Sequence, residues 1–179
     1  KGDLLQNSYL SQNIFSVQDE TIYKNIPQNG GTWSGQPGNS KWMPNKEDIP
    51  KQPYGNEKTW ATILEEHGID GIEFKEGEPD FTPVAEGSVE IEDFTTNRDD
   101  NFFQADQNLA QKWNQESKNG KNDWSISDIR QYRKEKKLTW HERSDMKNMD
   151  LVAQEIHGNI PHSGGISKKK RLELEENND

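Results

Sequence analysis

The chain of 179 residues has room for one domain of ordinary size, or for a small domain with an appendage. It contains no cysteine, which excludes disulfides, thiolate zinc sites and cysteine nucleophiles, so a bound metal must be held by histidine, carboxylate or amide groups. No apolar stretch approaches the roughly 18 to 20 residues of a membrane-spanning helix, and a charged fraction of 30% against 28% hydrophobic residues indicates that part of the chain lacks a continuous core.

The net charge of -10 conceals two electrostatically different parts. Residues 1–119 carry 10 basic and 21 acidic side chains, whereas residues 120–171 carry 12 basic and 7 acidic ones. A basic segment attracts phosphate groups through counterion release, and an acidic segment repels them. The second part is therefore a candidate for contact with nucleic acid, although such a charge distribution is equally typical of a solvated face.

The N-terminal half is expected to begin with a leader and to continue with loops and short elements. Residues 1–31 are rich in Gln, Asn and Ser, which is typical of a linker that ends at a Gly-Gly turn. Glycine and proline predict loops over 32–54. A helix is predicted over 57–67, with Gly68 as its C-terminal stop.

Alternating apolar and polar residues predict two strands further on, over 69–74 and 88–94, and we expect them to pair with each other across the turn at 77–79. Apolar spacing then predicts a helix over 102–113. A second helix is expected from Ser125 to about residue 137, because Ser125 and Asp128 have the spacing of a capping box.

The C-terminal part has the pattern of a strand, a turn, a strand and a helix. The strands are predicted over 138–143 and 149–152, and the helix over 153–157, ended by Gly158. The whole pattern predicts an α+β fold with four segments. These are a linker or leader at 1–31, an acidic accessory region at 32–120, a basic module at 121–171 and an acidic tail at 172–179.

Three of the four histidines, His141, His157 and His162, lie within 22 residues around the predicted hairpin and helix. The end of a strand and a helix packed across the hairpin face each other at a separation that suits one ion. Two imidazoles with a carboxylate from Glu142 or Asp145 would form a site for a divalent transition metal, or for magnesium with mostly water ligands. An unligated imidazole would be able to deprotonate a water. The competing interpretation is that the three histidines are ordinary half-buried residues that bind no ion.

Four consecutive basic side chains follow the histidines, namely Lys168, Lys169, Lys170 and Arg171. They are candidates for contact with phosphate groups, and they are equally typical of a solubilising surface. Trp140 is interpreted as a packing residue, and His67 as a helix-terminal residue favoured by the helix dipole.

About 30 residues, Leu138–Ser167, carry a Trp-His-Glu element at 140–142, Ile-His-Gly at 156–158 and Pro-His-Ser-Gly-Gly at 161–165. This stretch resembles the C-terminal toxin nucleases of the HNH/endonuclease VII superfamily, in the branch marked by a Trp-His-His or Trp-His-Glu element. Such modules end bacterial polymorphic toxins, including LXG and contact-dependent inhibition effectors. The region 35–106 is similar, less specifically, to sequences that accompany this nuclease.

The resemblance implies a ββα-metal (His-Me finger) module that hydrolyses phosphodiesters with one divalent ion, which is Mg, Mn, Zn or Ni. By position it implies that His141 is the general base and that Glu142, His157 and His162 surround the metal. Because the second position of the element is Glu142 rather than histidine, the roles of His141 and Glu142 are open to exchange. The run from Lys168 to Arg171 is expected to bind the substrate.

The function implied by the resemblance is that of an antibacterial toxin domain used in bacterial competition, a metal-dependent endonuclease that cleaves DNA of the target cell. DNA is favoured because hydrolysis by an ion and an activated water needs no ribose 2′-hydroxyl, and RNA remains the alternative. The resemblance further implies a cognate immunity protein and secretion as the C-terminal part of a larger toxin that acts in the cytoplasm of the target bacterium, without membrane insertion by this fragment. The competing hypothesis is a non-catalytic, metal-stapled interaction module.

Overall fold

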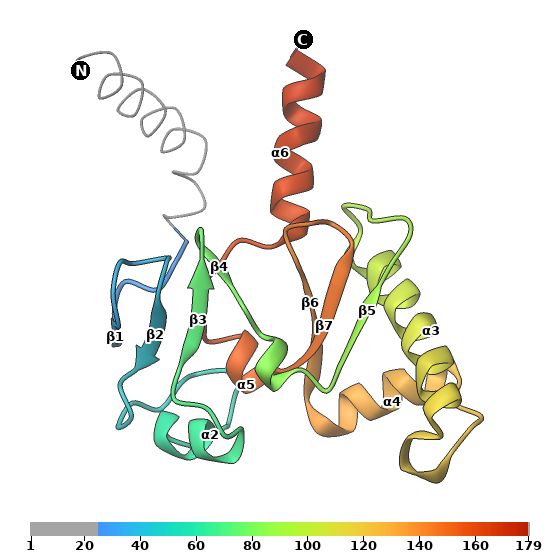
Figure 1. Ribbon diagram of the computed structural model, residues 1–179, viewed down its shortest axis with the longest axis horizontal. Helices are drawn as coiled ribbons and strands as arrows, with labels where there is room; N and C mark the ends of the chain where they lie inside the picture. Colours follow the sequence, from blue (N-terminus) through green and yellow to red (C-terminus); the bar gives the residue numbers. More distant parts are fainter. Residues whose placement is uncertain (1–24, 179) are drawn as a thin grey trace, which may run out of the picture.

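The computed structural model describes residues 25–178 as an α+β protein with two antiparallel sheets (Figure 1). The predicted fold class is therefore confirmed. Most of the predicted leader lies outside the described residues. No helix in the described part of the chain is long and apolar enough to cross a membrane.

The first sheet has four short strands in the order β1-β2-β3-β4. They are β1 (Gly31–Trp33), β2 (Lys41–Pro44), β3 (Ile72–Lys75) and β4 (Glu78–Pro79), each antiparallel to its neighbour. Between β2 and β3 lies α2 (Trp60–Glu66), whose N-cap Thr59 accepts a hydrogen bond from the Thr62 amide. The predicted helix is confirmed, and two of the strands occupy the region predicted as loops.

The second sheet has the order β5-β7-β6. Its strands are β5 (Gly87–Glu90), β6 (Leu138–Glu142) and β7 (Asn148–Ala153), again antiparallel, and they pack against α3 (Arg98–Glu116) and α4 (Ile126–Lys136). The predicted hairpin and both predicted helices are confirmed. Strands from both sides of the predicted boundary at residue 120 share this sheet.

The predicted pairing of the strands over 69–74 and 88–94 is wrong. β3 pairs with β2 and β4, while β5 pairs with β7, which lies about 60 residues further along the chain. Alternation in a sequence identifies which face of a strand is buried, but it carries no information about which strand will be its neighbour.

The remaining elements are short or terminal. They are two 3₁₀ turns, η1 (Thr82–Val84) and η2 (Lys118–Gly120), and two further helices. The helix α5 (Gln154–His157) follows β7 directly, and α6 (Gly165–Asn178) ends the described chain. Figure 1 shows α6 extending away from the rest of the molecule. The sequence pattern did not predict this helix, and its last turns occupy the segment that was expected to be an acidic tail.

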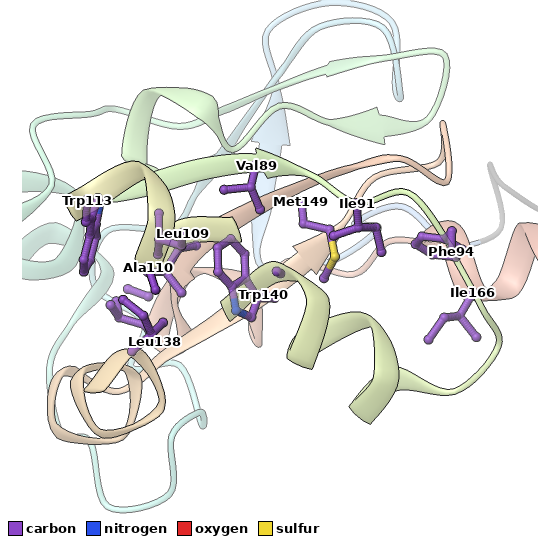
Figure 2. Packing of buried hydrophobic residues seen from close by; sticks show 14 residues of the cluster. Val89, Ile91, Phe94, Leu109, Ala110, Trp113, Leu138, Trp140, Met149 and Ile166 are labelled. Atoms are coloured by element: carbon purple, nitrogen blue, oxygen red, sulfur yellow. The ribbon is translucent and has the colours of Figure 1, made fainter. Parts of the chain in front are cut away.

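Two hydrophobic cores flank the second sheet. The first lies between that sheet and the helices α3 and α4 and contains Leu109, Trp140 and Met149 (Figure 2). Leu151 belongs to the same core. The second joins α2, the first sheet and α5, and Val152 of β7 reaches into it. Successive side chains of a strand point to opposite faces, so β7 contributes to both cores. Each fully buried large apolar side chain contributes roughly 1.5 to 3 kcal/mol.

Candidate metal centre

Three histidines from different segments converge on one point beside the hairpin. His141 comes from β6, His157 is the last residue of α5, and His162 lies in the loop before α6. One nitrogen from each ring lies within 4.8 Å of the corresponding nitrogens of the other two. The ring centroids are 4.8 to 5.2 Å apart, and His141 Nδ1 lies 3.2 Å from His157 Nε2.

The local sequence explains this convergence. In the hairpin register His141 lies opposite Asp150, on the face of β6 that Trp140 does not use. Because α5 begins immediately after β7, it turns back across this face and brings His157 towards His141. The loop after α5 then returns His162 to the same place.

Hydrogen bonding and burial prepare the rings to act as ligands. His162 Nδ1 donates a hydrogen bond of 2.6 Å to the Ile160 carbonyl, which leaves the lone pair on Nε2. Burial, assisted by repulsion from neighbouring charge, lowers the pKa of His141 to about 3 and that of His157 to about 2. Burial also lowers the pKa of His162. Neutral imidazoles, which metal ions require, are therefore favoured at neutral pH.

One atom of this group lacks a hydrogen bond. Among the residues that the structure describes, the buried Nε2 of His141 has no hydrogen-bonding partner. Buried polar atoms in native proteins are almost always satisfied, and a cation or its water ligands would satisfy this one. The three histidines thus fit a divalent ion in their chemistry and in their convergence.

Glu142 occupies a different position from the one that the sequence predicted for a metal ligand. Its side chain points to the opposite face of β6, where Asn101 Nδ2 donates a hydrogen bond of 2.7 Å and Arg98 Nε one of 3.3 Å to the carboxylate. Burial raises the pKa of Glu142, while the contacts with Asn101 and Arg98 counteract part of this effect. The group of three histidines does not include this carboxylate.

A cavity of about 420 Å³ nevertheless lies at the C-terminal end of β6, and residues from both faces of this strand line it. It is lined by the three histidines, by Glu142 and by Arg98, and on the far side by the start of α6. The cavity therefore presents imidazole nitrogens, a carboxylate and a guanidinium to the same space. A phosphodiester would find in one place the groups that bind its charge and a group that accepts a proton from water.

The four basic residues of the predicted substrate-binding run lie on the first turns of α6, next to cavity-lining Ser167. Lys169 Nζ donates a hydrogen bond of 2.7 Å to the Phe94 carbonyl, and Lys170 is exposed. The buried Arg171 Nε has no hydrogen-bonding partner within residues 25–178. The run therefore begins at the rim of the cavity, and its contact with phosphate groups stays a prediction.

Sequence reasoning missed two residues that contact Glu142, namely Arg98 and Asn101, both more than 40 positions upstream. Asn101 is fully buried on the face of α3 that also carries Ala105 and Leu109. A polar residue at i, with apolar residues at i+4 and i+8, was the available signal, because a buried amide requires a specific partner.

A family model described as the DNase/tRNase domain of colicin-like bacteriocin matches residues 71–164, more than half of the chain. The chain belongs to the colicin-DNase family. It is therefore a nuclease toxin domain, and the resemblance inferred from the sequence is confirmed at this level. No curated protein matches the chain.

The part that matches the colicin-DNase family extends from Gly71 to Gly164. It includes the second sheet, the helices α3 to α5 and all three histidines of the group. The basic run on α6 lies beyond the match, as do β1, β2 and α2.

Proposed function

We propose that the chain is an HNH-type, metal-dependent endonuclease of the Trp-His-Glu branch and that it hydrolyses phosphodiester bonds in nucleic acid of a target bacterium. The convergence of three neutral imidazoles in a cavity that also holds a carboxylate carries this proposal. The membership of the colicin-DNase family supports a nucleic acid as the substrate.

The residues that would hold the ion are His141, His157 and His162. A set of three imidazole nitrogens suits zinc or nickel better than magnesium, which prefers oxygen ligands, and manganese is intermediate. When bound, the ion would polarise the phosphoryl group and stabilise the leaving oxygen.

Glu142 is proposed as the general base. The grouping of His141 with the other two imidazoles supports this choice over the assignment in which His141 is the base and Glu142 a ligand. A carboxylate whose pKa is raised by burial is a better proton acceptor near neutral pH than an exposed one. The amide of Asn101 fixes one carboxylate oxygen and so orients the group.

Arg98 is proposed to contact the phosphate that is cleaved. Its guanidinium lines the cavity, and its side chain is 66% exposed even though Nε contacts Glu142. Guanidinium groups match the geometry of phosphate oxygens and remain charged at any physiological pH. The run from Lys168 to Arg171, at the rim of the same cavity, is proposed to hold the flanking backbone by charge.

DNA is the proposed substrate, because hydrolysis by a bound ion and an activated water needs no 2′-hydroxyl, and RNA is the alternative on the same fold. A cognate immunity protein in the producer, and secretion as the C-terminal part of a larger toxin that acts in the cytoplasm of a competitor, belong to the same proposal. The description of the matched family as a bacteriocin domain supports both.

The test is to incubate the purified chain with supercoiled plasmid, and separately with tRNA and ribosomal RNA, in the presence of Mg²⁺, Mn²⁺, Zn²⁺, Ni²⁺ or EDTA. We expect nicking of the plasmid that EDTA abolishes. Cleavage of RNA alone would replace the substrate and keep the mechanism. Cleavage that persists in EDTA would overturn the metal dependence, and no cleavage by folded, metal-loaded protein would overturn the proposed activity.

A further inference from the structure

Phe81 lies against all three histidines of the candidate metal centre. Its ring centroid is 4.8 Å from that of His141, 5.4 Å from that of His157 and 5.5 Å from that of His162. The interplanar angles are 77°, 53° and 68°, so the imidazoles meet the phenyl ring edge to face or tilted. Phe81 is 1% exposed, so its ring is enclosed by the protein on the side where it meets the histidines.

This ring comes from another part of the fold than the histidines. Phe81 lies between β4 and η1, and it belongs to the second core together with Phe74, Ile156 and Ile160. The segment that links the two sheets thus contributes a wall of the centre whose histidines come from β6, α5 and the loop after α5.

The backbone around Phe81 is held on both sides. The amide before it, that of Asp80, donates a hydrogen bond to the Glu73 carbonyl at 2.8 Å, and the carbonyl of Phe81 accepts one from the Val84 amide at 3.1 Å. The Asp80 carboxylate accepts hydrogen bonds from both the amide and the hydroxyl of Thr82. The backbone that carries the ring is therefore held in place, and the nearly complete burial of the side chain restricts movement of the ring.

A fixed aromatic wall limits how the imidazoles turn. Each ring has two torsions, and a ligand nitrogen that rotates away from the common point no longer contributes to binding. Aromatic pairs prefer the edge-to-face contacts that Phe81 makes, and a smaller aliphatic side chain would leave free space on the side of the rings away from the cavity. Outer-shell groups that fix metal ligands by hydrogen bonds change metal affinity by about 10-fold to 100-fold, and we take this range as the expected size of the effect of the Phe81 wall.

We propose that Phe81 is a positioning residue of the three-histidine centre: its ring sets the orientation of His141, His157 and His162 before the ion binds. The proposal rests on the proposed function insofar as these three residues hold the ion. It assigns to the segment that links the two sheets a part in assembling the metal site, in addition to its part in the second core.

The test compares Phe81→Leu with Phe74→Leu in the full chain. Phe74 is a matched control, because it is 4% exposed in the same core, and within the described residues no ring contact links it to a histidine. Zn²⁺ affinity is measured by competition with a chromophoric chelator, the ligand field is measured from the visible spectrum of the Co²⁺-loaded protein, and thermal unfolding of the metal-free proteins reports the loss of stability.

We expect Phe81→Leu to lower Zn²⁺ affinity about 10-fold to 100-fold and to alter the Co²⁺ spectrum. Phe74→Leu, with a comparable loss of thermal stability, should leave both properties unchanged. If Phe81→Leu does not fold, Phe81→Met, whose flexible side chain fills more of the volume, is expected to show the same two changes.

Wild-type affinity and spectrum in the Phe81 variant would overturn the proposal while leaving the metal centre intact. Equal losses in the Phe74 variant would also overturn it, because the effect would then come from the core in general. A wild-type protein that binds neither Zn²⁺ nor Co²⁺ would overturn the metal centre itself, and with it the proposed function.

Discussion

At the scale of single residues, Glu142 illustrates how one strand supplies two different chemical groups. Neighbouring residues of a strand point to opposite faces, so His141 enters the group of imidazoles while Glu142 turns towards α3. On that side Asn101 and Arg98 hold its carboxylate. The cavity at the end of β6 then brings both faces into contact with the same space.

Replacement of Glu142 by glutamine removes the proposed base and keeps its shape. We expect the rate of cleavage to fall by about 10²-fold to 10⁴-fold, the usual contribution of a general base, with unchanged affinity for Zn²⁺ or Ni²⁺. Initial rates of plasmid or tRNA cleavage and titration calorimetry with the metal measure the two effects. Glu90→Gln, at an exposed position of β5, is the control and should change neither.

A different result would make His141 the general base and Glu142 a residue without that role. If Glu142→Gln cleaves at the wild-type rate, while His141→Ala binds metal as well as the wild type but does not cleave, His141 is the base. The two variants therefore decide between the assignment supported by the grouping of the histidines and the assignment first implied by the sequence.

Asp106 is a second residue whose substitution has a defined consequence. Its carboxylate, 1% exposed, accepts hydrogen bonds from Arg133 Nε and Nη2 at 2.9 and 2.7 Å and from Trp140 Nε1 at 2.8 Å. Asp106→Asn leaves the guanidinium without its counter-ion, so we expect a loss of about 3 kcal/mol in the free energy of unfolding, measured with urea. Asp123→Asn, at an exposed position, should change stability by less than about 0.5 kcal/mol.

At the scale of elements, α5 depends on its neighbours, because a helix of four residues has no stability of its own. Glu155 on this helix accepts hydrogen bonds from His67 and Lys58 and from the amide of Asn56. The side chain of Asn159, just after the helix, donates to the Gln52 carbonyl and accepts from the Gln52 amide. These contacts tie the helix that ends in His157 to the region around α2.

The contacts of Glu155 make part of the stability dependent on pH. Burial acts to raise its pKa, but hydrogen bonds from His67 and Lys58 outweigh burial and hold the pKa below its ordinary value of 4.5. A lowered carboxyl pKa contributes stability that is fully present above the unfolded-state value and is lost as the pH falls through the folded-state value.

The variant Glu155→Gln should therefore be less stable than the wild type at about pH 6, by about 1 to 3 kcal/mol, and this difference should shrink as the pH falls towards about pH 3. Urea unfolding at several pH values measures the difference. A difference that is the same at both ends of the range would show that the charge of Glu155 contributes nothing.

What could be predicted at this scale follows from how local each signal is. The helix that begins after Ser125 was predictable because its capping box lies within four residues, and the structure has both of its hydrogen bonds. The hairpin was predictable for the same reason, and so was the convergence of the three histidines, because they lie within 22 residues of one another. The partner of β5 was not, because pairing with β7 joins segments about 60 residues apart. Phe81, Arg98 and Asn101 also contact residues of the site that lie more than 40 positions further along the chain, so no local pattern places them there.

At the scale of the whole molecule, the candidate metal centre lies on a body that has hydrophobic cores on both sides of β7. Small domains that depend on a metal for folding generally lack such cores. Here Trp113, Trp140, Leu109 and Ile129 are fully or almost fully buried on one side, and Ile63 and Ile156 on the other. The apolar burial, and not the ion, should therefore be sufficient to keep the chain folded.

This arrangement separates an enzyme from a metal-stapled interaction module. We expect EDTA to abolish cleavage while the far-UV circular dichroism and a cooperative thermal transition remain. Zn²⁺ at 100 times its dissociation constant should then stabilise the folded state by about 2.7 kcal/mol, because an ion that binds only the folded protein shifts the unfolding equilibrium by mass action. Loss of the cooperative transition on chelation would instead indicate that the three histidines hold the fold together, and the case for a catalytic centre would then rest on cleavage alone.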